Sequence, residues 1–381
     1  MLLALLAFAQ WAARASAPQA LAWLGPPQRV GPGLEYFTSR DRELVDDAGP
    51  IAAYLLRLDA NRIRLASVHA NDETLGLEPV DSIATRQQAI AAVNGSFFNP
   101  NGDPQFVLKE AGELVSDAAA TRGAVIIQSP RRGRTVLEFD QIGARVSLTF
   151  NARGRTWVVP IDGVNKTRER GKLMLYTARY HPDTDTAPGG TEWVLSGKPA
   201  RVTDVRRGAG RTAIPRDGSV LSFGGVDLPE ALAALAPGAR VSFRTAWTSL
   251  NGVPPRHMET ADDIVSGAGL LRVKGRILDN RQTAEGLPTS YETTRHPRTM
   301  IGVDAGGFIW MVAVDGRAPD HSIGMTFADL ERLCDRLRLT DALNLDGGGS
   351  TTMVIKGEVV NVPADGLGPR PVSDAILVSA R

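Results

Sequence analysis

The chain has 381 residues, 43% of them hydrophobic and 22% charged, which is typical of a globular protein with a real core. Its formal net charge of +1 and the absence of basic runs exclude a nucleic-acid-binding protein that relies on a positive surface. The single cysteine, Cys334, excludes an intramolecular disulfide, and no HExxH or CxxC spacing indicates a zinc site.

Residues 1–17, MLLALLAFAQWAARASA, predict a signal peptide and therefore export to the periplasm or the medium. The apolar run is too short to span a bilayer, and small residues in an Ala-x-Ala pattern follow it. An amphipathic N-terminal helix is the alternative. No later segment is long and apolar enough for a transmembrane helix. Residues 18–44 are punctuated by proline and glycine, and we interpret them as a leader segment before one domain at 45–381.

The next segments predict a hairpin, a helix and a series of strands. Residues 51–70 indicate two strands with a bend at Asp59-Ala60-Asn61. Residues 82–93 have helical composition and spacing, and the helix is expected to stop at Asn94-Gly95. From 122 to 226, short apolar stretches alternate with Gly, Pro and Arg turns, which predicts strands.

Two further helices are expected, a short one at 228–235 and a longer one at 326–339. Thr326 is placed to cap the second helix, with Asp329 completing a variant of the capping box. Since the remaining segments favour strands, the predicted fold class is α+β, with strand-rich mixed sheets, few helices and a single main domain.

Two polar stretches in the first half contain candidate site residues. In VNGSFFNPNGDPQ (93–105), Asn94 and Gly95 follow the predicted helix, and a plain helix stop is the simpler interpretation. In residues 162–195, Asn165, Arg168 and Glu192 surround strands and a Thr/Gly-rich loop. For Glu192, the alternative is a solvated charge on a strand.

Two more polar stretches follow in the second half. Arg298 precedes a strand that turns into the apolar FIWMVAV, which predicts a strand buried on both faces and ended by Asp315-Gly316-Arg317. The segment ALNLDGGGSTT predicts a buried strand carrying Asn344 and Asp346 into three glycines and then hydroxyl side chains. Glycines let a backbone approach a ligand and present N–H groups to an oxyanion, although a tight turn alone would also use one or two of them.

These residue types combine phosphate donors with carboxylates. Arg298, Arg317 and the backbone N–H groups suit a phosphate, whereas Asp346 and Glu192 suit acid–base or nucleophilic work. A substrate with both an anionic group and a glycosidic bond would use both sets. The missing lysine and following helix argue against a P-loop.

Several of these segments resemble the phosphodiester glycosidase family. They are AAVNGSFF, HPRTMIGVD, VAVDGR, SIGMTFADL and above all ALNLDGGGSTTMVIKGEVVNVPAD, in order from Asn94 to the terminal RPVSDAILV. The resemblance implies hydrolysis of a sugar-1-phosphodiester at the anomeric carbon, giving a free sugar of the N-acetylglucosamine type and a phosphomonoester. The family's Asn-Gly pair falls on Asn94 and Gly95, its Pro-Arg-Thr on 297–299, and its glycine run on 344–350. Ser96 and Pro369 depart from the family pattern.

From these observations we assign a candidate site. The candidate catalytic residues are Asp346, Glu192, Arg298 and Asn94. The candidate substrate-binding residues are Gly95, Asn165, Arg168, Thr299, Arg317, Asn344, Gly347, Gly348, Gly349, Ser350 and Thr351.

The substrate is expected to be a glycan or glycolipid with a phosphodiester-linked sugar. The sequence requires no cofactor and leaves a metal unassigned. Two alternatives stay open, a phosphodiesterase that cuts P–O bonds and a non-catalytic module that binds cell-wall polysaccharide. The scattered histidines argue against the first, and the aromatic content of 6% argues against the second.

Overall fold

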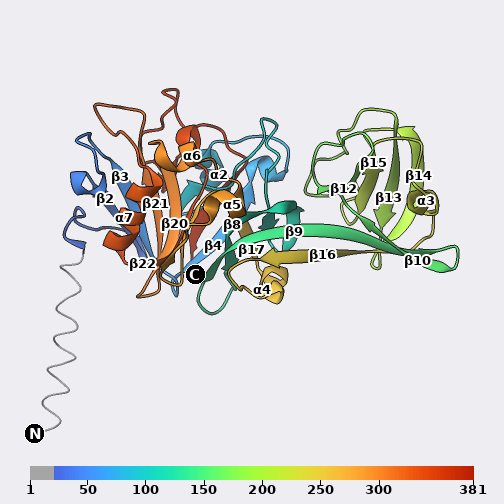
Figure 1. Ribbon diagram of the computed structural model, residues 1–381, viewed down its shortest axis with the longest axis horizontal. Helices are drawn as coiled ribbons and strands as arrows, with labels where there is room; N and C mark the ends of the chain where they lie inside the picture. The colour runs from blue at the N-terminus through green and yellow to red at the C-terminus, as the bar shows by residue number, and fades with distance from the viewer. Residues whose placement is uncertain (1–20) are drawn as a thin grey trace, which may run out of the picture.

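The computed structural model describes residues 21–381, so the predicted signal peptide at 1–17 lies outside the described residues. Figure 1 shows a main body of packed sheets and a smaller lobe that projects to one side. Among the helices of residues 21–381, none combines the length and the apolarity needed to cross a membrane.

An eight-stranded sheet forms one layer of the main body, with β21 in its interior between β3 and β20. Alternate residues of β21 enter two different hydrophobic cores, with Met311 in one and Trp310 in the other, which confirms that this strand is buried on both faces. The strands, in sheet order, are β1 (Gln28–Gly31), β2 (Leu34–Ser39), β3 (Ala53–Asp59), β21 (Phe308–Val314), β20 (Arg298–Asp304), β22 (Leu339–Asn344), β18 (Leu270–Val273) and β19 (Arg276–Ile277).

A five-stranded sheet, the C-terminal sheet, packs against the first across a shared core. Its strands, in order, are β24 (Glu358–Val359), β23 (Met353–Ile355), β5 (Ala91–Asn94), β25 (Asp374–Ala380) and β4 (Ile63–His69). Both strands predicted within 51–70 form, but the predicted hairpin pairing is wrong. β3 pairs with β2 and β21 whereas β4 pairs with β25, because Leu58 and Ile63 on either side of the bend enter the same core between two facing sheets.

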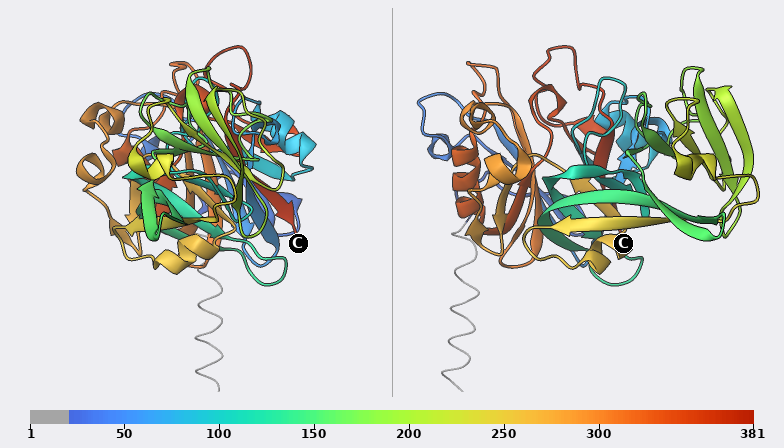
Figure 2. Two further views of the ribbon diagram at one scale, coloured as in Figure 1. Left: turned by 90° about the vertical axis from the view of Figure 1, so that its right-hand side faces the viewer. Right: turned by 45° about the vertical axis from the view of Figure 1, so that its right-hand side comes forward.

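A seven-stranded sheet links the main body to the lobe. Its strands are β10 (Arg155–Pro160), β9 (Val136–Ala152), β8 (Ala118–Gln128), β17 (Asp263–Ser266), β6 (Leu108–Glu110) and β7 (Glu113–Ser116), with β16 (Val241–Ser249) paired to β9. Figure 2 shows β9 and β16 extending from the body under the lobe as a long ribbon.

The lobe sheet is the fourth sheet. It contains β11 (Gly163–Val164), β12 (Leu173–Thr177), β15 (Ser219–Phe223), β13 (Gly190–Ser196) and β14 (Arg201–Ala209). β11 and β12 are parallel, and the other strand pairs of the described chain are antiparallel. Trp193 and Phe150 share a lobe core with α3, which lies at the far side of the molecule (Figure 1). The lobe therefore has its own hydrophobic core.

The helices are short. They are α2 (Val80–Arg86), α3 (Glu230–Ala233), α4 (Pro255–Thr260), α5 (Arg281–Glu285), α6 (Thr289–Thr293) and α7 (Phe327–Leu337), with 3-10 turns at η2 (Arg42–Leu44), η3 (Ala70–Asp72) and η4 (Gly348–Ser350). The predicted capping box of α7, with Thr326 and Asp329, is confirmed. The sequence did not predict α4, α5 and α6, since five or six residues carry too little periodicity.

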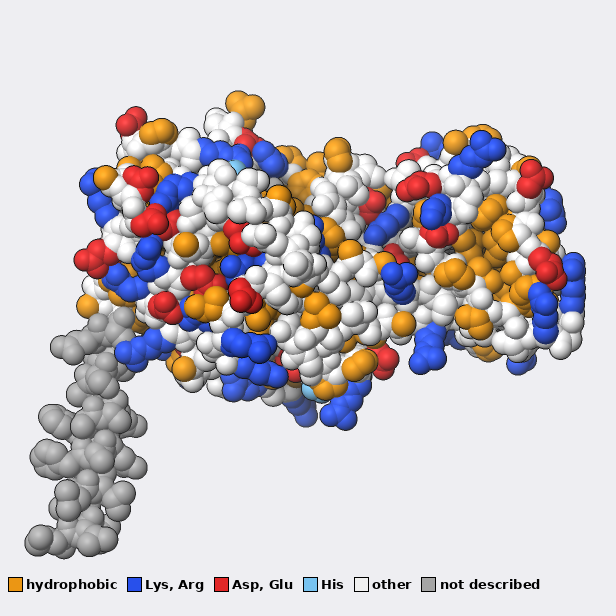
Figure 3. All heavy atoms as spheres, in the orientation of Figure 1, with side chains coloured by type: hydrophobic (Ala, Val, Ile, Leu, Met, Phe, Trp, Pro, Cys, Tyr) orange, Lys and Arg blue, Asp and Glu red, His pale blue; other side chains and the backbone are white. Residues whose placement is uncertain are grey.

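The strand-rich character is confirmed, and the domain boundaries stay a prediction. β1 and β2 fall in the segment expected as a leader, 18–44, and pair into the eight-stranded sheet. In Figure 3, acidic and basic side chains are interspersed over the visible face, as the small net charge indicates.

Candidate active site

Polar side chains at the ends of several strands meet where the eight-stranded and C-terminal sheets come together. Asn94 ends β5, Thr299 lies at the start of β20 and Asn344 ends β22. The helix predicted at 82–93 is wrong in its second half: α2 ends at Arg86, and the buried residues 91–93 pair as a strand with β23 and β25. Asn94 is therefore held at a strand end.

The side chain of Asn94 connects the two sheets and is fully buried. Its Oδ1 accepts hydrogen bonds from Thr299 Oγ1 at 2.7 Å and from the Thr352 N–H at 3.1 Å. Its Nδ2 donates to the carbonyl oxygen of Asp346 at 2.7 Å. Asn94 thus fixes the backbone on both sides of the three glycines, which makes it a positioning residue.

Asp346 lies partly exposed at this edge. Its Oδ1 accepts the Gly347 N–H at 2.9 Å, and its own N–H donates to the Gly95 carbonyl at 3.1 Å. Burial raises the pKa of Asp346 to about 6, and hydrogen bonds from Ser350 and Gly347 oppose that rise. A carboxylate whose pKa is shifted toward the working pH is typical of a catalytic group.

Gly95 and Gly347 stand where a side chain has no room. A Cβ at Gly95 would collide with Asp374 Oδ2, and a Cβ at Gly347 would lie 2.7 Å from the carbonyl oxygen of Pro297. Asp374 also accepts the N–H of Ser96 at 3.1 Å. The glycines therefore allow the backbone beside Asp346 to pack closely against two neighbouring segments.

Gly348 and Gly349 leave room for two arginines. Gly348 has a φ of +61°, and a Cβ there would lie 2.9 Å from Arg317 Nη2. A Cβ at Gly349 would collide with the guanidinium of Arg370. Arg370 Nε donates to Asp365 Oδ2 at 2.7 Å, whereas Arg317 is exposed and forms no ion pair within residues 21–381. Two guanidinium groups thus lie against the glycine loop.

Arg298 is buried and its donors serve the protein itself. Its Nε donates to the Met325 carbonyl at 3.0 Å, and its Nη2 donates to the carbonyls of Tyr291 and Thr294 at 2.8 and 3.0 Å. Arg298 therefore holds α6 and the start of α7 in place beside the site. Of the predicted arginines, Arg317 has the geometry that better suits a ligand contact.

Three half-buried rings lie around the same edge. The centroids of Phe97 and Tyr291 are 6.3 Å apart, and those of Tyr291 and His296 are 6.4 Å apart. Tyr291 Oη accepts a hydrogen bond from Asn344 Nδ2 at 3.2 Å. Burial together with the positive charges of Arg298 and Arg317 lowers the pKa of His296, so that its ring is neutral at pH 7.

Glu192 and Arg168 belong to the lobe. Glu192 is fully buried in β13, and its Oε1 accepts bonds from Ser222 Oγ at 2.7 Å, Thr186 Oγ1 at 2.9 Å and Thr184 Oγ1 at 3.1 Å. Arg168 Nη1 lies 3.4 Å from the same oxygen. No contact within the described residues joins this cluster to Asp346, which lies in the main body.

Asn165 joins the lobe to the body. Its Nδ2 donates to the Val115 carbonyl in β7 at 2.9 Å, and its Oδ1 accepts the Thr177 N–H in β12 at 2.8 Å. Asn165 is buried with a φ of 53°, in the left-handed region that asparagine tolerates. These contacts are structural.

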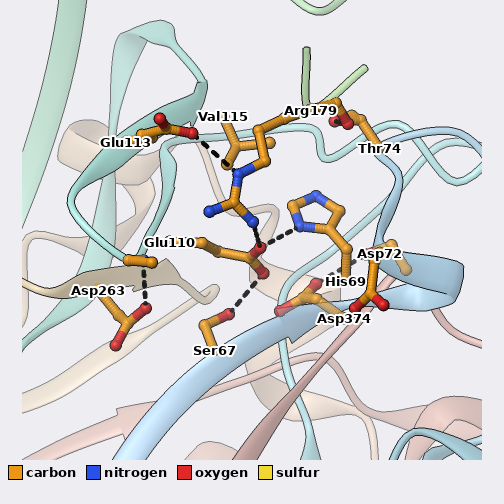
Figure 4. Close-up of polar contacts among 12 residues, drawn as sticks. Ser67, His69, Asp72, Thr74, Glu110, Glu113, Val115, Arg179, Asp263 and Asp374 are labelled. Carbon is orange, nitrogen blue, oxygen red and sulfur yellow. Dashed lines mark hydrogen bonds and ion pairs between the residues drawn. The ribbon is translucent and has the colours of Figure 1, made fainter. Parts of the chain in front are cut away.

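An ionic cluster joins the buried side chains of His69 and Glu110 in the main body to Arg179 of the lobe (Figure 4). His69 Nδ1 is 2.7 Å from Glu110 Oε2, and Arg179 of the lobe lies 3.7 Å from the same oxygen and 2.9 Å from Glu113. Burial by itself lowers the pKa of His69, but the Glu110 carboxylate raises it above the ordinary value overall. His69 is also the register partner of Asp374, so the cluster borders the Asp346 edge.

The sequence reasoning missed several residues of this edge, namely Phe97, Tyr291, His296, Arg370 and Asp374. Arg370 and Asp374 stand in RPVSDAILV, a segment that resembles the family pattern. That resemblance was a signal in the sequence that could have identified both as candidate site residues. Within residues 21–381, no group of three or more His, Cys, Asp or Glu side chains could hold a metal ion.

Comparison with known proteins finds a family and two curated relatives that match parts of this chain. Residues 190–379 match the profile of a family described as phosphodiester glycosidase. An uncharacterized SPbeta prophage-derived protein, YomE, of Bacillus subtilis (strain 168) is 35% identical over 98 residues, which are 26% of this chain and 15% of that protein. The N-acetylglucosamine-1-phosphodiester alpha-N-acetylglucosaminidase of Bos taurus is 28% identical over 110 residues, 27% of this chain and 20% of that enzyme.

Solved structures resemble most of the fold. A hypothetical protein from Synechocystis aligns over 94% of this chain and 64% of its own chain, with a TM-score of 0.76 and 22% identity. At that identity the likeness concerns the fold alone. The matched segments span a fifth or less of the two curated relatives, so those sequence matches cover only part of each protein.

Proposed function

Residues 190–379 place this chain in the phosphodiester glycosidase family, a family of glycoside hydrolases, and from this premise we propose that it hydrolyses a sugar-1-phosphodiester. The bond cleaved is the one between the anomeric carbon and the phosphate oxygen. The products are a free sugar of the N-acetylglucosamine type and a phosphomonoester.

The observation that carries the proposal is the position of two guanidinium groups beside a carboxylate with a raised pKa. Arg317 and Arg370 lie against Gly348 and Gly349, which follow Asp346 by two and three residues in the sequence. Guanidinium groups and exposed backbone N–H groups bind phosphate oxygens, and arginine does so in a bidentate manner. A phosphodiester held there would present its sugar to Asp346.

In this mechanism a water oxygen attacks the anomeric carbon while the bond from that carbon to the phosphate oxygen breaks. The bond electrons leave with the phosphate, which Arg317 and Arg370 stabilise, so a strong general acid is less necessary than in most glycosidases. Ionised Asp346 accepts the water proton or stabilises the positive charge that develops on the sugar. Asn94 and Arg298 hold this arrangement in place.

The rings of Phe97, Tyr291 and His296 supply the apolar surface for the sugar ring. All three rings are partly exposed at this edge. We do not propose Glu192 as the partner of Asp346, because hydroxyl groups and Arg168 of the lobe already surround its Oε1. We expect the substrate to be a glycan or glycolipid outside the cytoplasm, because residues 1–17 predict a signal peptide.

The test is turnover of methyl-capped N-acetylglucosamine-1-phosphate by the full chain and four variants. Asp346→Asn should lower kcat by at least ~100-fold, as expected for loss of a charged catalytic group. Arg317→Gln and Arg317→Lys should lower kcat/KM, because Arg317 both binds the phosphate and stabilises its charge as it leaves, with lysine the milder change. Arg240→Gln, an exposed arginine of the lobe, is the matched control and should keep full activity. Full activity in a folded Asp346→Asn protein would reject the proposal.

A further inference from the structure

The lobe contains a cavity that the proposed reaction does not use. Its volume is about 450 Å³, and it lies where the lobe sheet meets β7 of the main body and the ribbon strand β16. Cavities of this size at the junction of two structural units are common small-molecule sites. Asp346 and its glycine loop do not line this cavity, whose walls come mainly from β12, β13, β16 and the segments at 196–200 and 216–219.

The inner wall of the cavity is apolar and its mouth is polar. Leu175, Leu195 and the half-buried ring of Phe243 line the inside, whereas Ser196 and Ser219 contribute hydroxyl groups. A sugar ring matches such a wall, since it presents C–H groups on its faces and hydroxyl groups around its edge. The half-buried aromatic ring offers the flat contact that a sugar face needs.

Two cations at the mouth have no partner in the protein. Lys198 and Arg216 are exposed, and within residues 21–381 neither forms an ion pair or a side-chain hydrogen bond. Of the two acids that line the cavity, Glu113 is already paired with Arg179 at 2.9 Å (Figure 4), which leaves Asp217 as the unpaired acid. The unpaired charges of the cavity therefore sum to an excess of positive charge.

We propose that this cavity binds a sugar unit that carries an anionic group, a phosphate or a carboxylate, as a second glycan site apart from Asp346. Phe243 and the leucines contact the ring, the two serines contact its hydroxyl groups, and Lys198 and Arg216 bind the anion. The second site would hold a distant unit of the same anionic glycan whose phosphodiester is cut at Asp346. Only this last link rests on the proposed function.

The mouth of the cavity is kept open by glycines. Gly197 has a φ of +87°, which a residue with a side chain rarely adopts, and a Cβ at Gly218 would collide with the carbonyl oxygen of Leu195. Both glycines flank the cationic residues in sequence. Gly218 thus lets the 216–219 loop approach Leu195 of the lobe sheet closely, beside the side chains of Lys198 and Arg216.

The experiment is isothermal titration calorimetry, which measures the affinity and stoichiometry of binding. The full chain is titrated with N-acetylglucosamine 1-phosphate and, in parallel, with neutral methyl α-N-acetylglucosaminide. In the double variant Lys198→Gln/Arg216→Gln, one equivalent of bound sugar phosphate should be lost, or its affinity should fall at least ~10-fold. Asp217→Asn should strengthen the same binding event, because it removes the unpaired acid. Arg240→Gln serves as the control for loss of a lobe arginine.

Binding that is the same in the wild type and the double variant would overturn the proposal, as would equal affinity for the charged and the neutral sugar. Phe243→Ala provides a second variant that acts on the ring contact, and thermal unfolding shows that each variant is folded. Because binding is measured without turnover, the result does not depend on the proposed hydrolysis. The protein could cleave no phosphodiester while the double variant still binds one equivalent of sugar phosphate less than the wild type. In that case the second site stands, and only the proposed hydrolysis is rejected.

Discussion

Asp346→Asn is expected to stabilise the protein at neutral pH while it removes activity. Burial raises the pKa of Asp346 from the usual 3.8 to about 6, which means that the fold disfavours its ionised form. Since one pKa unit corresponds to ~1.4 kcal/mol, the ionised carboxylate costs up to about 3 kcal/mol of folding free energy above pH 6. Asparagine has nearly the same shape, can still accept the Gly347 N–H, and has no charge to bury.

The pH dependence of this difference follows from linkage. Below pH 3.8 the carboxyl is protonated in both the folded and the unfolded chain, so Asp346 carries no penalty. Between 3.8 and about 6 the unfolded chain ionises first, and the wild type loses stability relative to the variant as the pH rises. Above about 6 the difference is constant.

Urea unfolding of both proteins at several pH values between 4 and 8 measures this effect. We expect the free energy of unfolding of Asp346→Asn to exceed that of the wild type by 1–3 kcal/mol at pH 7.5, and the gap to close toward pH 4. A variant that is less stable at pH 7.5, or a gap that does not change with pH, would refute the reasoning. A less stable variant would mean that hydrogen bonds to the carboxylate outweigh its burial, and a constant gap would mean that folding does not shift the pKa of Asp346.

Three more predictions concern the same edge. Activity on a phosphodiester substrate should fall as the pH drops through about 6, because Asp346 must be ionised; a pH–rate profile with no acid limb near that value would contradict its role. Asn94→Ala should cost about 2–4 kcal/mol of unfolding free energy, because it removes the side-chain hydrogen bonds to Asp346, Thr299 and Thr352. Thr299→Val should cost only about 1 kcal/mol, because it removes one of these bonds. Equal costs in urea titrations would argue against the central position of Asn94. Gly95→Ala should destabilise by at least ~2 kcal/mol, since its Cβ would collide with Asp374, and a neutral effect in thermal unfolding would show that the loop can yield.

The strands at the centre of the fold were predictable because their residues are buried on both faces. FIWMVAV is a long apolar run, and Thr326 with Asp329 is a strong local signal for the start of α7. Which strands pair with each other was harder to predict, as residues 51–70 illustrate. Two strands joined by a tight bend look like a hairpin in sequence, yet β3 and β4 enter separate sheets because both present apolar side chains to one interior.

The site was predictable where neighbouring residues in sequence act together. Asn344, Asp346 and the glycines are adjacent, and their positions in one turn follow from the buried strand that precedes them. Which distant residues meet that turn depends on tertiary packing, and so Arg370, Asp374 and Tyr291 were missed. Glu192 was grouped with Asp346 on residue type alone, and its place in a separate lobe could not be foreseen from spacing.

The most direct test of the proposed reaction is the fate of the label when methyl-capped N-acetylglucosamine-1-phosphate is hydrolysed in ¹⁸O-labelled water. Attack at the anomeric carbon, as proposed for the Asp346 site, places ¹⁸O in the free sugar and leaves the methyl phosphate unlabelled. Label in the phosphate product would mean that water attacked phosphorus, and the roles of Asp346, Arg317 and Arg370 would then have to be reassigned.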